Sequence, residues 1–84
     1  MKKYMVTLAY SRPEFNEYKL KYVKSNSIEE LQKLVRDYID ENEIFSSEWE
    51  GGQVYDTEKK ELVGIIAYNG KFFNKEEAKK YSLK

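Results

Sequence analysis

The sequence predicts a small α+β protein with the element order ββαβββα: an antiparallel-rich sheet, one long amphipathic helix on one sheet face and a short C-terminal helix. Residues 4–10 and 62–68 are apolar or β-branched at nearly every position, as in strands covered on both faces. Residues 28–42 repeat apolar side chains every three or four positions, the period of an amphipathic helix. The dipeptide Asn69-Gly70 favours a tight hairpin turn, because both residues tolerate positive φ.

Size and composition restrict the classes of protein to consider. At 84 residues the chain suits a single α+β domain over residues 1–84. It contains no cysteine and no histidine, which excludes disulfides, the usual zinc sites and catalytic pairs of serine or cysteine with histidine. No stretch approaches the roughly 20 apolar residues that cross a bilayer, and no signal-peptide pattern follows the first methionine. We therefore expect a cytoplasmic protein with no membrane contact.

The first 24 residues predict a β-hairpin. Residues 4–10 are expected to form a central strand, and Pro13 marks the turn into a second strand over residues 15–24. Apolar and charged side chains alternate along the second strand, and we assign its apolar face to the core: Tyr18, Leu20 and Tyr22. Lysines are expected on or beside the opposite face of this strand, close to a sheet edge: Lys19, Lys21 and Lys24.

A capping pattern marks the start of each predicted helix. Ser27 and Glu30 have the spacing of a capping box, in which each side chain accepts a hydrogen bond from a free backbone N–H at the helix start. The long helix is expected to follow and to end near Asn42. Asn74 begins a second pattern of this kind, which predicts a short helix over residues 75–82.

Three further strands are expected after the long helix. Ile44 and Phe45, in the connecting segment, are expected to tuck under the sheet edge. The glycine pair 51–52 indicates a bulge or sharp turn before a third strand. Residues 62–68 then form a fourth strand and residues 71–73 a fifth. We expect the first and fourth strands inside the sheet and the second and third nearer its edges.

One face of this sheet lacks an obvious cover. Two strands are patterned for burial on both faces, but the chain contains one strongly amphipathic helix. The second face must then be covered by the weak C-terminal helix, by loops or by another chain. A homodimer is one arrangement that would cover it.

Acidic residues are concentrated in the middle of the chain. Net charge is zero, with 15 basic and 15 acidic residues. Residues 37–50 nevertheless contain no lysine or arginine and carry these carboxylates: Asp37, Asp40, Glu41, Glu43, Glu48 and Glu50. Such an asymmetry attracts a basic partner, although an ordinary solvated face is the simpler interpretation.

No group of residues in the sequence predicts catalysis. Glu48 and Glu50 flank Trp49 at a spacing that places two carboxylates on one strand face, but nothing in so short a chain builds a cleft for hydrolysis. The acids lack the pattern of a calcium loop, and the glycine pair lacks the residues of a phosphate loop. We therefore expect no enzymatic activity, no metal and no cofactor.

Nucleic acid is considered as an alternative partner. Tyrosines interleaved with lysines over residues 18–24 resemble a strand on which bases stack. Alternation places those tyrosines and lysines on opposite faces, and zero net charge opposes general binding, so nucleic acid is not the expected partner. The alternative that stays open uses basic terminal segments brought together in space: Lys2, Lys3, Lys19, Lys21 and residues 75–80.

The leading hypothesis is a small regulatory or inhibitory protein that binds another protein. The chain has eight tyrosines, four phenylalanines and one tryptophan, and aromatic side chains serve as interface anchors. We expect Trp49, Tyr55 and Phe72 to stay accessible, because they lie near glycines or hairpin ends. A basic partner would contact them, the acidic segment and an exposed sheet edge. A composition typical of AT-rich bacterial or phage genomes suggests a sharper form, in which the segment occupies the basic groove of a nucleic-acid enzyme.

Overall fold

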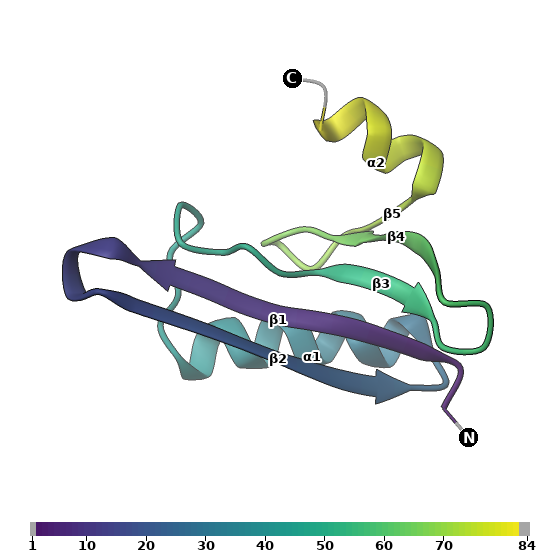
Figure 1. Cartoon of the computed structure of the whole chain (residues 1–84), viewed down its shortest axis with the longest axis horizontal. Coiled ribbons are helices and arrows are strands. Elements are labelled where there is room, and N and C mark those ends of the chain that lie inside the picture. The colour runs from purple at the N-terminus through teal and green to yellow at the C-terminus, as the bar shows by residue number, and fades with distance from the viewer. Residues whose placement is uncertain (1, 83–84) are drawn as a thin grey trace.

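A computed structural model describes residues 2–82 of the chain. Its elements are β1 (Tyr4–Arg12), the short 3-10 turn η1 (Pro13–Phe15), β2 (Glu17–Ser25), α1 (Ile28–Glu41), β3 (Gln53–Asp56), β4 (Glu61–Ile66), β5 (Phe72–Asn74) and α2 (Lys75–Ser82). The strands form an antiparallel sheet with a long and a short helix, which confirms the predicted α+β class (Figure 1). None of the helices in the described part is long and apolar enough to cross a membrane.

The strand order is β2-β1-β3-β4-β5. β1 and β4 are interior and β2 is an edge, as predicted, but the prediction that the third strand lies near an edge is wrong. The connection after α1 returns along β1, where Glu50 N–H donates to Ala9 O (3.0 Å) and Gly52 N–H donates to Thr7 O (2.7 Å). β3 therefore enters the sheet between β1 and β4, and the short β5 becomes the second edge. β4 ends at Ile66, slightly before the predicted end.

The hydrophobic core lies between α1 and one face of the sheet. Leu31, Val35 and Ile39 are spaced four residues apart on α1, and all three are buried. They pack with the buried side chains of one sheet face and of the following connection: Val6, Leu8, Tyr10, Ile44, Val54 and Ile66. Burial of this helix stripe stabilises α1 more than its intrinsic propensity does.

The two predicted capping boxes differ in detail. At α1, the Ser27 hydroxyl accepts from Glu30 N–H (3.3 Å), but the Glu30 carboxylate accepts from the Ser25 hydroxyl instead of from Ser27 N–H. Ser27 N–H donates to the Ser25 hydroxyl (3.2 Å), so a buried serine replaces half of the expected box. At α2, Asn74 and Glu77 form the full reciprocal pair, at 2.9 and 3.0 Å.

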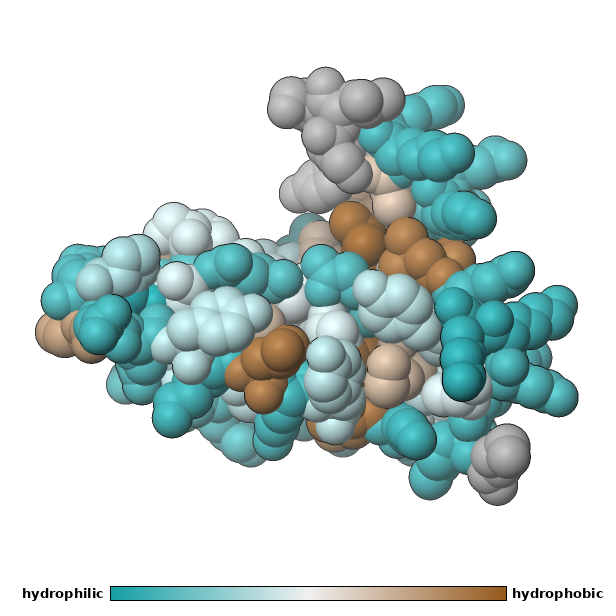
Figure 2. All heavy atoms as spheres, viewed as in Figure 1, coloured by the Kyte–Doolittle hydropathy of each residue, from teal (hydrophilic) through white to brown (hydrophobic). Residues whose placement is uncertain are grey.

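The sheet face opposite α1 is partly open. Tyr18, Leu20 and Tyr22 of β2 are 57%, 47% and 56% exposed, so their assignment to the core is wrong. In an antiparallel pair, residues directly opposite share a face, and these three stand opposite residues of β1 that point away from α1. Alternation showed that they share a face but not which face the helix would cover. Brown and pale side chains gather on this face in Figure 2.

Lys24 and Phe45 also lie differently from their predicted positions. Lys24 stands opposite Met5, which places it on the open face with the tyrosines. Lys21 instead lies on the α1 face, with Nζ 5.2 Å from the centroid of the Tyr38 ring. Phe45 is exposed, whereas the adjacent Ile44 is buried, so only one of the two residues packs under the sheet as predicted.

Candidate functional site

Most carboxylates of the predicted binding segment gather at one end of the molecule. This end is formed by the turn between β1 and β2, the last two turns of α1 and the connection over residues 42–48 (Figure 1). Its seven acids outnumber the four basic residues beside them, Arg12, Arg36, Lys19 and Lys21. The acids are Glu14, Glu17, Asp37, Asp40, Glu41, Glu43 and Glu48. We call this region the acidic end.

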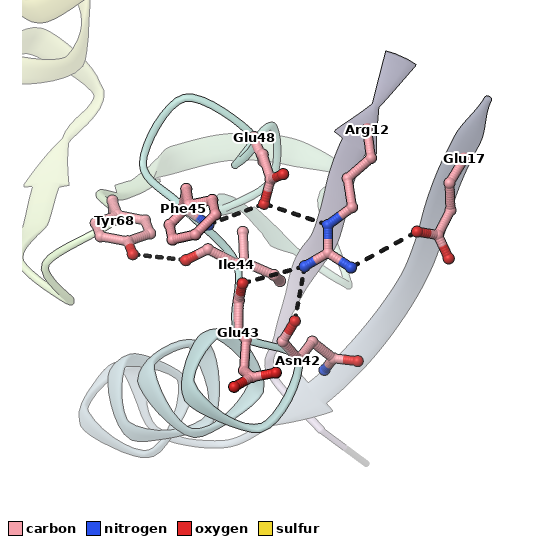
Figure 3. Close-up of polar contacts among 8 residues, drawn as sticks. All are labelled: Arg12, Glu17, Asn42, Glu43, Ile44, Phe45, Glu48 and Tyr68. Atoms are coloured by element: carbon pink, nitrogen blue, oxygen red, sulfur yellow. Dashed lines mark hydrogen bonds and ion pairs between the residues drawn. The ribbon is translucent and has the colours of Figure 1, made fainter. Parts of the chain in front are cut away.

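Arg12 joins the segments that form the acidic end (Figure 3). Its guanidinium donates to the main-chain carbonyls of Asn42 (2.8 Å) and Glu43 (3.1 Å). It also lies 3.3 Å from the carboxylate of Glu48 and 3.6 Å from that of Glu17. Desolvation opposes the charge on Arg12, but the hydrogen bond and the charge of Glu48 outweigh it and raise the pKa of the guanidinium. A planar group with several fixed donors suits this position, where β1, β2 and the end of α1 meet.

Glu48 has a structural role in this arrangement. Besides Arg12, its carboxylate binds Phe45 N–H at 2.9 Å, and its side chain is 12% exposed. The connection is also held from the other side, where the Tyr68 hydroxyl donates to Ile44 O at 2.6 Å (Figure 3). Among the predicted partner-binding acids of the acidic end, Glu48 is therefore the least available to a partner.

The other predicted partner-binding acids of the acidic end are exposed, and folding gains little from them. Asp37, Asp40 and Glu41 lie in the last turns of α1, which has no basic residue in its final turn, so their charges oppose the negative end of the helix dipole. Asp40 pairs with Arg36 at 3.0 Å, but exposed pairs of this kind stabilise weakly. Glu43 has a φ of 50°, a conformation that suits glycine or asparagine better. These positions are acidic at some cost to stability.

Two exposed phenylalanines lie beside these carboxylates. Phe15 is 76% exposed and Phe45 is 69% exposed, and both line a hollow of about 790 Å³ at the acidic end. Glu17 and Glu43 line the same hollow, together with Arg12 and Glu48. Sequence reasoning missed the two phenylalanines, because it placed residue 15 at the start of the second strand and Phe45 under the sheet edge, although a polar residue directly follows each of them. Exposed aromatic residues that gather in this way are informative, whereas single ones are common.

The remaining predicted site residues do not join the acidic end. Trp49 is half-buried against the core, its ring centroid 6.4 Å from that of Tyr38, and its Nε1 is buried without a hydrogen-bond partner within residues 2–82. Phe72 packs against the core from β5. Tyr55 stands opposite Met5 on the open face, and Glu50 is exposed beside β1.

Within residues 2–82 there is no metal site, and the two basic terminal segments do not form one patch. Within residues 2–82, no group of three or more potential ligands is arranged to hold a metal ion. The N-terminal end and α2 lie on separate parts of the molecule in Figure 1, so Lys2 and Lys3 do not join the lysines of α2. Comparisons with protein-family models, curated proteins and solved structures found no match.

Proposed function

We propose that this chain is a small, non-enzymatic interaction protein that binds a basic segment of another protein at its acidic end. The observation that carries the proposal is the pairing of Phe15 and Phe45, 76% and 69% exposed, around one hollow with Glu17 and Glu43. Aromatic side chains act as anchors in interfaces, and carboxylates beside them attract lysine and arginine. Arginine also stacks on aromatic rings.

The cost of the acidic residues to the fold supports the same proposal. Asp37, Asp40 and Glu41 stand at the wrong end of the helix dipole, and Glu43 occupies a backbone conformation that disfavours it. Residues that reduce stability at a solvated surface are expected where function requires them. The arrangement held by Arg12 keeps the hollow in one shape before a partner arrives, which lowers the entropy cost of binding.

The chemistry of the acidic end defines the partner. A complementary surface presents lysine or arginine around one or two apolar side chains that contact Phe15 and Phe45. Basic grooves of this kind occur on enzymes that handle nucleic acids, because such grooves bind phosphates. An acidic protein seated there would block the groove, so inhibition of such an enzyme is the sharper form of the proposal.

The proposal is tested by affinity capture from an extract of the source cell, with and without nuclease treatment. The bait variants are Phe15→Ala with Phe45→Ala, and Glu41→Lys with Glu43→Lys. The matched control, Glu58→Lys with Glu76→Lys, makes the same charge change at exposed positions elsewhere. Glu48 is left unchanged because its loss would disturb the site itself.

A partner that survives nuclease, is lost with either acidic-end variant and is retained by the control is the expected result. Affinity for this partner should also fall as salt is raised, since rim charges are screened. If the control variant loses the partner to the same extent, the acidic end is not the binding site. Capture that disappears with nuclease would favour the nucleic-acid alternative.

A further inference from the structure

We propose a second binding site, on the open face of the sheet, for a planar base that carries a phosphate. The ligand is either a free nucleotide or one unit of a single-stranded nucleic acid. The site is a shallow hollow of about 470 Å³ above β1, lined by Met5, Thr7, Tyr22, Lys24, Tyr55, Asp56, Thr57 and Lys60. It is independent of the acidic end, because the two hollows involve opposite ends of the nine-residue strand β1.

The tyrosines supply a platform for a flat ring. Tyr22 of β2 stands opposite Thr7, and Tyr55 of β3 stands opposite Met5, so the two aromatic side chains flank β1 on the open face. Strands are about 4.8 Å apart, which separates β2 from β3 by roughly 10 Å, enough for a planar ring to lie against either tyrosine. Tyr22 is 56% exposed, and bases stack on accessible aromatic rings of sheets.

Two lysines supply positive charge at the rim. Lys24 shares the open face with Tyr22, and Lys60 reaches the hollow from the turn between β3 and β4. Both are exposed, and neither forms an ion pair within residues 2–82. The one carboxylate of the lining, Asp56, accepts hydrogen bonds from Glu58 N–H and Lys59 N–H, both at 2.9 Å. Two lysines and one carboxylate give this rim a net positive charge, which an anionic group complements.

Alternation in the sequence disfavours base stacking because it places Tyr22 in the core and the neighbouring lysines on the other face. Lys19 and Lys21 do lie on the α1 face, but Tyr22 is exposed and Lys24 lies beside it. Lys60 also has a φ of 57°, where glycine or asparagine would be less strained, so a lysine is kept there against the local backbone preference.

The test measures fluorescence anisotropy of labelled single strands of thymidine and of uridine, about ten nucleotides long, at about 50 mM salt. Unlabelled uridine monophosphate is the competitor. The site variants are Tyr22→Ala and Lys24→Glu with Lys60→Glu. The matched control is Lys19→Glu with Lys71→Glu, an equal charge change at exposed positions outside the hollow. Circular dichroism confirms that each variant is folded.

Both site variants are expected to weaken binding about tenfold, and the control by less than about twofold. If uridine monophosphate displaces the labelled strands, the ligand is a free nucleotide. If the strands bind but uridine monophosphate does not displace them, the ligand is a single-stranded nucleic acid. The proposal is overturned by absence of binding to all probes, or by equal weakening in both lysine pairs, which indicates diffuse attraction. It is also overturned if sedimentation reveals a dimer that Tyr22→Ala dissociates, since a second copy would then occupy the face.

Discussion

The guanidinium of Arg12 and the carboxylate of Glu48 approach to 3.3 Å, which joins the end of β1 to the connection that follows α1. The same carboxylate accepts a hydrogen bond from Phe45 N–H, and the same guanidinium binds two carbonyls at the end of α1. This pair therefore holds the backbone that presents Phe45 to solvent. Glu48, which was predicted to contact a partner, therefore also shapes the site.

Removal of Glu48 is expected to loosen this region. Glu48→Ala removes one of the carboxylates paired with Arg12 and the acceptor of the Phe45 N–H, and should lower the thermal midpoint by roughly 5 to 10 °C. Proteolysis within residues 42–50 should become faster in the same variant. Asp40→Asn, which removes an exposed ion pair, is the control and should change the midpoint by at most about 2 °C. Equal midpoints for both variants would contradict a structural role for Glu48.

Two glycines with positive φ are expected to differ in their tolerance of alanine. Gly52 has a φ of 97°, and an added Cβ would lie 2.1 Å from the main-chain oxygen of Ile66. Gly70 has a φ of 89°, but its added Cβ would meet the flexible side chain of Arg36 at 2.7 Å. Gly70→Ala should therefore cost about 1 kcal/mol of the free energy of unfolding. Gly52→Ala should cost several times more or prevent folding, as measured by urea denaturation.

Asp56 is expected to contribute to the loss of stability in acid. Hydrogen bonds from Lys59 N–H and Glu58 N–H outweigh desolvation and lower the pKa of Asp56 below its ordinary value of 3.8. The folded state thus favours the ionised form, so this contribution is present above the ordinary pKa and is lost as the pH falls through the lowered value.

The variant Asp56→Asn keeps an acceptor oxygen but no charge. It should be less stable than the wild type at about pH 6.5, and the difference should shrink when the pH is lowered below about 4. Urea midpoints across this range provide the measurement, with Asp37→Asn on the exposed surface of α1 as control. A difference that stays constant into acid would show that the charge of Asp56 is not involved.

The two faces of the sheet should respond differently to leucine substitutions. Leu8 is buried against α1, and Leu8→Ala should cost about 2 to 5 kcal/mol. Leu20, on the neighbouring strand, is 47% exposed, and Leu20→Thr should change stability by less than about 0.5 kcal/mol. Chemical denaturation at two protein concentrations checks both values. A large, concentration-dependent cost at Leu20 would mean that another chain covers the open face.

Two exposed residues are expected to limit stability. Glu43 and Lys60 have φ values of 50° and 57°, and asparagine tolerates this conformation better than either. Glu43→Asn and Lys60→Asn should each raise the free energy of unfolding by up to about 1 kcal/mol. Each should also weaken binding at its own site, the acidic end or the hollow on the open face. Stabilisation without loss of binding would remove the functional explanation for these residues.

Local sequence patterns determined most of the secondary structure of this protein. The spacing of apolar residues predicted α1, because apolar side chains at three- and four-residue steps lie on one face only if the segment is helical. Turn residues placed the hairpins, and Asn74 with Glu77 placed the start of α2 through bonds that span three residues. The sequence also showed the excess of carboxylates in the acidic segment, since the charge of a segment can be counted from its residues alone.

Tertiary structure alone decided where these elements and their side chains lie. Alternation showed that Tyr18, Leu20 and Tyr22 share a face, but the position of α1 decided that this face is open. β3 lies beside β1 because the connection after α1 runs along that strand, a pairing between residues distant in sequence. The two hollows follow from these placements, since Phe15 and Phe45 line one hollow and Tyr22 flanks β1 opposite Tyr55 only after the chain has folded. Local propensities act over a few residues, whereas contacts between distant segments depend on the packing of the whole chain.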